Sequence, residues 1–200
     1  MENVSYFCPL KFNIYTMDKK VFTTRFWFLL TVIFAGAFMR LLPHWPNFTP
    51  IAAIALFGGA YFSRKYLAFL VPLAAMLLSD LILGFHITMP AVYLSFVATV
   101  GIGLLIARKP KLLNIAGASL SASVLFFVVT NFASWMGSPF YPQTFTGLME
   151  AYAAGLVFFN NGSEGISFFL NSVIGDLFYN GLFFGAFYLA RLRFPVLARA

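Results

Sequence analysis

The sequence predicts an all-α membrane protein with six transmembrane helices, and its composition and patterning support this class. Of the 200 residues, 61% are hydrophobic and only 10% are charged, and the apolar residues fall into long runs. A soluble chain has about 45–50% apolar and about 25% charged residues, so a disordered chain and a typical soluble enzyme are excluded. The single cysteine, Cys8, excludes a disulfide-stapled secreted domain.

The first 25 residues are mixed in polarity and rich in lysine. They do not resemble a cleaved signal peptide, because the apolar run after Arg25 is long and has no small-residue cleavage site. We expect residues 1–25 to form a cytoplasmic arm, with Met17 as an alternative natural start. Residues 26–190 then form a single six-helix domain, and residues 191–200 form a basic cytoplasmic tail.

Six apolar runs predict the spans, since crossing a hydrocarbon core of about 30 Å takes about 20 helical residues. The second run is short and rich in alanine and glycine. The fifth ends at an irregular stretch, 133–145, which contains Gly137, Pro139 and Pro142. The predicted spans are 26–42, 48–62, 66–85, 91–107, 112–132 and 166–190.

Residues 146–160 form an ambiguous apolar segment that carries Glu150. As a helix it would cover only about 22 Å, which is short for a span. If it crossed the membrane, there would be seven spans. The positive-inside rule favours six spans with both termini cytoplasmic, which leaves 146–160 as an interfacial or re-entrant helix on the outer side and only Arg40 outside. The basic residues placed inside are Lys11, Lys19, Lys20, Arg25, Arg64, Lys65, Arg108, Lys109, Lys111, Arg191, Arg193 and Arg199.

Three ionisable residues lie within the predicted spans, where a charge is costly and is usually functional. Arg40 and Asp80 lie near the outer ends of the first and third spans, and Asp176 lies deeper in the sixth. One interpretation is that Arg40 pairs with Asp80 or Asp176 and fixes the bundle. A second is that at least one of the three contacts a ligand, and the two do not exclude each other. A proton relay is a third.

Polar side chains also recur at helical spacing in two spans, and such rows normally face the bundle interior. They predict either hydrogen bonds between helices or the walls of a polar cavity. The rows are Ser172, Asp176 and Asn180 in the sixth span, and Ser119, Ser123 and Asn131 in the fifth. Small residues four positions apart predict close helix packing; these pairs are Ala55 and Gly59, Ala118 and Ala122, and Gly181 and Gly185.

The predicted outer segments are chemically varied, whereas the inner ones are short and basic. Pro43, Pro46 and Pro50 predict an ordered, extended connection after the first span. Aromatic residues at this depth predict either an interfacial belt or a surface on which a ligand stacks. We therefore expect a site open to the exterior, and the polar and aromatic candidates in these segments are His44, Asn47, His86, Asn131, Trp135 and Tyr141.

Common catalytic and cofactor motifs are absent from the sequence. It contains no P-loop, GxGxxG, GxSxG, HExxH or CxxC pattern, so we expect no cofactor and no catalytic function. His44, His86 and Asp80 could form a metal site, but we predict none. The net charge of +7 sits in clusters between apolar runs, which indicates membrane topology and not nucleic-acid binding.

Several segments together resemble a bacterial family of small multi-pass proteins of unknown function. The resemblance implies a location in the bacterial cytoplasmic (inner) membrane. The segments are RLLPHWPNFTPIAAIALFGGAYF at 40–62, LVPLAAMLLSD at 70–80, FFVVTNFASW at 126–135, YPQT at 141–144 and GD at 175–176.

That family in turn resembles the S components of energy-coupling-factor vitamin transporters. Those are six-helix proteins that capture a vitamin or metal outside and rely on a transmembrane coupling subunit and two ATPases. S components commonly carry an AxxxA pair in the first span, where this chain has Thr31 and Ala35, and the segment 146–160 has no counterpart in their pattern. The resemblance implies a small-molecule ligand at the outer face, with energy from other subunits.

Two further functions stay open. A scaffold or other non-transport membrane subunit would have structural ion pairs and a filled interior. An intramembrane enzyme would bring Asp80 and Asp176 together. We favour substrate capture, with binding residues Arg40, His44, Asn47, Asp80, His86, Asn131, Trp135, Tyr141, Asp176 and Asn180.

Overall fold

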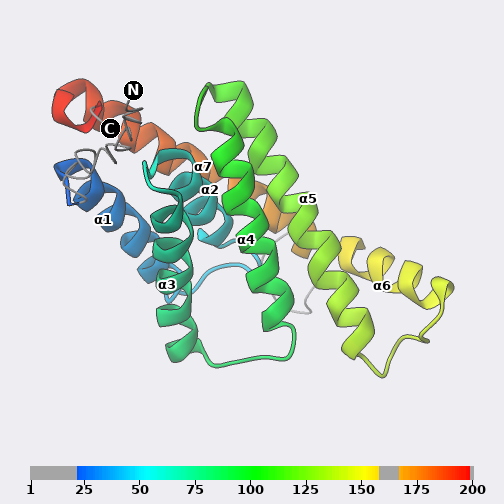
Figure 1. Ribbon diagram of the computed structural model, residues 1–200. Coiled ribbons are helices and arrows are strands. Elements are labelled where there is room, and N and C mark those ends of the chain that lie inside the picture. The colour runs from blue at the N-terminus through cyan, green and yellow to red at the C-terminus, as the bar shows by residue number, and fades with distance from the viewer. Residues whose placement is uncertain (1–21, 158–166, 199–200) are drawn as a thin grey trace, which may run out of the picture.

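The computed structural model describes residues 22–157 and 167–198, and every regular element within them is helical. This confirms the all-α class. Figure 1 shows a bundle of tilted helices, with one helix, α6, projecting beside the second half of α5. The elements are α1 (Thr24–Met39), α2 (Ile51–Tyr61), α3 (Lys65–Leu83), α4 (Met89–Ile106), α5 (Leu112–Gly137), α6 (Phe145–Val157), α7 (Phe168–Arg193) and a final 3-10 turn, η1 (Pro195–Ala198).

Four of these helices, α3, α4, α5 and α7, are long and apolar enough to cross a membrane. Helices of this length and composition indicate a membrane protein. The helices α1 and α2 are shorter than predicted, and the 11 residues of α2 extend only about 16 Å. Residues 40–50 between them leave the helical conformation. The prolines of that segment explain this, because each lacks an amide hydrogen and restricts the residue before it.

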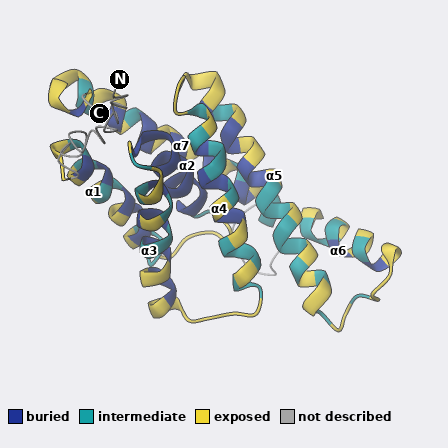
Figure 2. Ribbon diagram, in the orientation of Figure 1, coloured by how far each residue is buried: buried dark blue, intermediate teal, exposed yellow. Residues whose placement is uncertain are grey.

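The short helix α2 lies at the centre of the bundle. All of its residues are buried, and it contacts α1, α3, α4, α5 and α7. Figure 2 shows it as a dark core within the surrounding helices. It crosses α4 at Gly59 and Gly103, where a Cβ on either glycine would overlap a backbone carbonyl oxygen of the other helix. The predicted pair Ala55 and Gly59 therefore does serve close packing.

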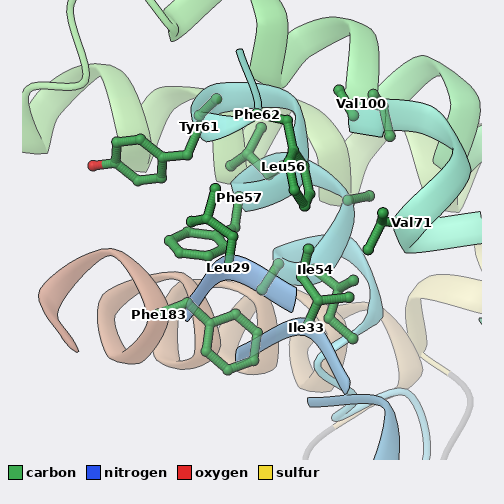
Figure 3. Packing of buried hydrophobic residues seen from close by; sticks show 14 of the residues in the cluster. Leu29, Ile33, Ile54, Leu56, Phe57, Tyr61, Phe62, Val71, Val100 and Phe183 are labelled. Atoms are coloured by element: carbon green, nitrogen blue, oxygen red, sulfur yellow. The ribbon is translucent and has the colours of Figure 1, made fainter. Parts of the chain in front are cut away.

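Aromatic side chains fill the space between the second half of α2 and the second half of α7. Phe57 packs against Phe183, Phe184 and Phe187, with ring centroids 5.3–6.1 Å apart. Tyr61 lies 4.3 Å from the ring of Phe187. Figure 3 shows Phe57 and Phe183 among the aliphatic side chains of α1, α2 and α3. We call this cluster of Phe57, Tyr61, Phe183, Phe184 and Phe187 the aromatic core.

The basic segments gather at one end of the bundle. At this end the Arg25 guanidinium donates from Nη2 to the Tyr61 carbonyl oxygen at 2.7 Å and lies over the rings of Tyr61 and Phe187. The start of α1, the end of α2 and the end of α7 therefore meet there. Figure 1 shows the α4–α5 turn at the same end. We call this the basic end; it holds Arg25, Arg64, Lys65, Arg108, Lys109, Lys111, Arg191 and Arg193.

At the opposite end, α5 is longer than the sequence predicts. The helix continues through Trp135 to Gly137, so the expectation of an irregular stretch from residue 133 is wrong. Residues 133–136 contain no helix breaker, and the chain turns only at Gly137 and Pro139. Helix α6 begins at Phe145, one residue before the predicted start. The predicted end of this segment at residue 160 and the predicted start of the last span at residue 166 lie outside the described residues, as does most of the N-terminal arm with Cys8.

The glycine pair of α7 faces away from the rest of the bundle. Nothing lies within 4 Å of a Cβ added at Gly181 or Gly185. The expectation that this pair brings helices of the chain together is therefore wrong for the part of the chain that the structure describes. In contrast, Ala118 and Ala122 of α5 are both buried.

Candidate functional site

An ion pair joins α1 and α3 at the end of the bundle opposite the basic end. Arg40, the residue that follows α1, pairs through Nη1 with Asp80 Oδ1 and also donates to Ser79 Oγ at 2.7 Å. Tyr93 of α4 donates its hydroxyl to Asp80 Oδ2 at 2.8 Å. The Asp80 side chain is 2% exposed and that of Arg40 is 12% exposed. Of the two partners that the sequence left open for Arg40, Asp80 and Asp176, the structure pairs it with Asp80. With the Tyr93 bond, this pair connects α1, α3 and α4.

The two predicted polar rows meet along the contact between α5 and α7. Ser123 donates to Asp176 Oδ2 at 2.6 Å, and Asn180 donates from Nδ2 to Ser119 Oγ at 3.0 Å. All four side chains are buried. Part of each row therefore forms hydrogen bonds between helices, while Ser172 and Asn131 line a cavity instead.

A cavity of about 470 Å³ lies between the ion pair and this contact. It is bounded by the α1–α2 and α3–α4 connections, the first halves of α2, α4 and α7, the second half of α5 and the end of α6. It reaches the surface, because His44, Asn47 and His86 at its rim are exposed. Its polar lining includes Arg40, His44, Asn47, Thr49, His86, Thr130, Asn131, Ser134, Ser172 and Asp176.

Aromatic rings form much of the remaining wall. Phe127 of α5 packs edge-on against Phe169 of α7, with centroids 4.9 Å apart. Phe96 and Phe126 lie 5.9 Å apart between α4 and α5. Together with Phe168 these rings line the cavity. The site thus combines flat apolar surfaces with many polar groups. In small-molecule pockets, apolar and aromatic walls bury the ligand and polar groups fix its orientation.

The segment 43–50 forms one side of the rim and is held against α7. Asn171 donates from Nδ2 to the Pro46 carbonyl oxygen at 3.1 Å. Gly175 lies so close to the backbone of Phe48 that a Cβ there would be 3.1 Å from the Phe48 Cα. Asn47 adopts a left-handed backbone, with φ of 62°, which asparagine tolerates better than most residues. These contacts fix the rim despite its lack of helical structure.

Six of the ten binding residues predicted from the sequence line this one cavity: Arg40, His44, Asn47, His86, Asn131 and Asp176. Asp80 lies behind the wall and holds Arg40 in place. The other three lie elsewhere. Asn180 lies deeper, bonded to Ser119, and Trp135 donates from Nε1 to the Pro142 carbonyl oxygen in the α5–α6 connection. Tyr141 belongs to that connection too, and neither Trp135 nor Tyr141 lines the cavity.

The alternative metal site of His44, His86 and Asp80 is not assembled. Across residues 22–157 and 167–198 no three histidine, cysteine, aspartate or glutamate side chains form a group that could hold a metal ion. Sequence reasoning also missed Tyr93 and the phenylalanine wall. Tyr93 could have been found as a polar residue within the first turns of an apolar helix. Single phenylalanines in a chain with 27 of them carry no such signal.

Comparison with known proteins adds the family. The model of a family of unknown function, DUF6580, matches residues 20–197. The chain belongs to this family. In this DUF6580 protein the match includes every cavity-lining residue and the whole described bundle except Ala198. No curated protein and no solved structure matches the chain.

Proposed function

We propose that this protein is the substrate-binding subunit of a small-molecule importer in the bacterial inner membrane. It has six spans and cytoplasmic termini, and it captures its ligand at the outer face. Separate membrane and ATPase subunits of the energy-coupling-factor type supply the energy. The substrate is a small molecule such as a vitamin, a cofactor precursor or a metal.

The position of the cavity is the observation that carries this proposal. It lies at the end of the bundle opposite the basic end, and basic residues concentrate on the cytoplasmic side of membrane proteins. The cavity then opens outward, while the aromatic core closes the inner half. A closed inner half suits a capture subunit, because passage of the ligand needs a rearrangement that another subunit drives.

The cavity also weighs against a scaffold function. A scaffold with purely structural ion pairs would have a filled interior, since empty space costs packing energy. Here polar side chains such as Asn131 and Ser172 line about 470 Å³ of space. A polar cavity of this size falls within the range of ligand pockets, about 300–1,000 Å³.

A thermal-stability screen of the purified full chain tests this function. A panel of vitamins, corrinoids and metal complexes should contain a compound that raises the unfolding temperature. At about 100 times its Kd a ligand stabilises a protein by about 2.7 kcal/mol. Ser134→Trp should abolish the shift, because Ser134 lies on the cavity rim.

Ser121→Trp is the matched control. Ser121 is exposed on the same helix but does not line the cavity, so the shift should remain. A panel without any stabilising compound would contradict the capture function. So would a shift that survives Ser134→Trp unchanged.

A further inference from the structure

Asp176 is a buried carboxylate that lines the cavity and has no cationic partner in the described part of the chain. Its residue is 3% exposed, and its one hydrogen bond comes from Ser123 to Oδ2. A single hydroxyl donor leaves most of the acceptor capacity of a carboxylate unused. Burial of such a group in charged form is costly unless a positive charge meets it.

The basic residues around the cavity do not supply that charge. Arg40 lines the cavity, but it is paired with Asp80, so the pair carries no net charge. His44 and His86 lie at the exposed rim, where their Nδ1 atoms contact Leu42 O at 2.6 Å and Thr88 Oγ1 at 2.9 Å. Among the described residues that line the cavity, Asp176 is therefore the acidic group without a basic partner.

The aromatic wall suits the same kind of ligand. A cation that lies over the face of a phenylalanine ring is attracted by the ring quadrupole, by about 0.5–2 kcal/mol depending on desolvation. Phe127 and Phe169 contact each other across α5 and α7, the same two helices that hold Ser123 and Asp176. A carboxylate and aromatic faces in one pocket are complementary to a positively charged nitrogen on an apolar body.

We propose that the cavity binds an organic cation, with its positively charged nitrogen at Asp176 and its flat apolar part against the phenylalanine wall. This rests on the proposed capture function and names its substrate class. A metal ion does not fit, since the lining offers no group of three metal-binding side chains among the described residues.

Three probes of nearly identical shape and different charge test the assignment on the purified full chain. N-methyl-4-phenylpyridinium is a permanent cation, 4-phenylpyridine is neutral at mildly alkaline pH, and biphenyl-4-carboxylate is an anion. Binding is measured by ligand-induced stabilisation and by calorimetry. We expect the cation to bind at least about tenfold more tightly than the neutral probe, and the anion to bind more weakly still.

Asp176→Asn removes the charge and keeps an oxygen that accepts from Ser123. It should abolish the preference for the cation, so that the cation and the neutral probe bind about equally. Glu150→Gln removes one negative charge from the exposed surface of α6, away from the cavity, and should leave the preference intact. If Asp176→Asn does not fold, the binding of the three probes to the wild-type protein still tests the cation assignment.

The outcomes separate this inference from the capture function. Equal binding of the three probes, preference for the anion, or no binding of the cation would overturn the cation assignment. A cation preference that persists in Asp176→Asn would overturn the role of Asp176. In each of these cases, the capture function would still be supported if a compound of the vitamin panel stabilised the wild-type protein and not Ser134→Trp. The substrate would then belong to a different class.

Discussion

The two ends of α2 face regions built from similar side chains but packed in opposite ways. At its carboxyl end, Phe57 and Tyr61 belong to the aromatic core, where rings pack on rings. At its amino end, Ile51 and Ala52 line the cavity, and rings face open space. The difference lies in what accompanies the rings. Glycines bring the helix backbones together beside the aromatic core, whereas polar groups surround the cavity, both on helices and on the non-helical connections.

The largest expected effect comes from truncating the aromatic core. Phe57→Ala should lower the free energy of unfolding by about 3–5 kcal/mol, because it leaves a void in a fully packed region. Phe168→Ala, a change of the same size in the half-buried cavity wall, should cost much less. Denaturation of both variants in mixed micelles checks this. Equal costs would show that the two regions are equally well packed.

A slightly smaller effect is expected at the crossing of α2 and α4. Gly59→Leu should destabilise the protein by about 3 kcal/mol, because the new side chain would meet the backbone of α4 at Val100. Gly181→Leu is the matched control, since open space surrounds Gly181. Thermal unfolding in detergent should be lowered only for Gly59→Leu. A loss at Gly181 as well would point to a contact that the described residues do not contain.

The smallest of the three effects is expected at the ion pair beside the cavity. Arg40→Ala should cost about 2 kcal/mol, because it leaves the buried Asp80 carboxylate without its cation. Removing both charges in Arg40→Ala/Asp80→Ala should cost less than the sum of the two single changes. Unfolding free energies of the three variants provide the measure. Additive costs would mean that the pair contributes no coupling, and that this region depends on packing as the aromatic core does.

The sequence predicted the parts of the fold that follow from apolar periodicity and charge. The apolar runs of α3, α4, α5 and α7 are long enough to predict helical spans. The cost of isolated charges in an apolar span predicted an acidic partner for Arg40, but it did not decide between Asp80 and Asp176. The shortness of α2 was harder to see, because its apolar run continues past the helix on both sides. The nearby prolines led us to predict that α5 ends at residue 132, but the helix continues to Gly137.

The cavity itself could be predicted only in part. Polar rows on α5 and α7 indicated which faces point inward, but not whether they would bond to each other or line a space. Both occur: Ser119 and Asn180 bond, while Ser172 lines the cavity. The aromatic wall needs the tertiary structure, because phenylalanines on lipid-facing and cavity-facing sides of a helix look alike in a sequence.

The complete enclosure of α2 has a consequence for how this protein is made. A ribosome synthesises α2 early, yet α7, which packs against it in the finished bundle, emerges more than a hundred residues later. Until then its alanines, glycines and aromatic rings have no permanent neighbours on the side that contacts α7. The bundle therefore lacks part of its core until α7 is added, and the cavity is complete only with that helix, because residues of α7 form part of its wall.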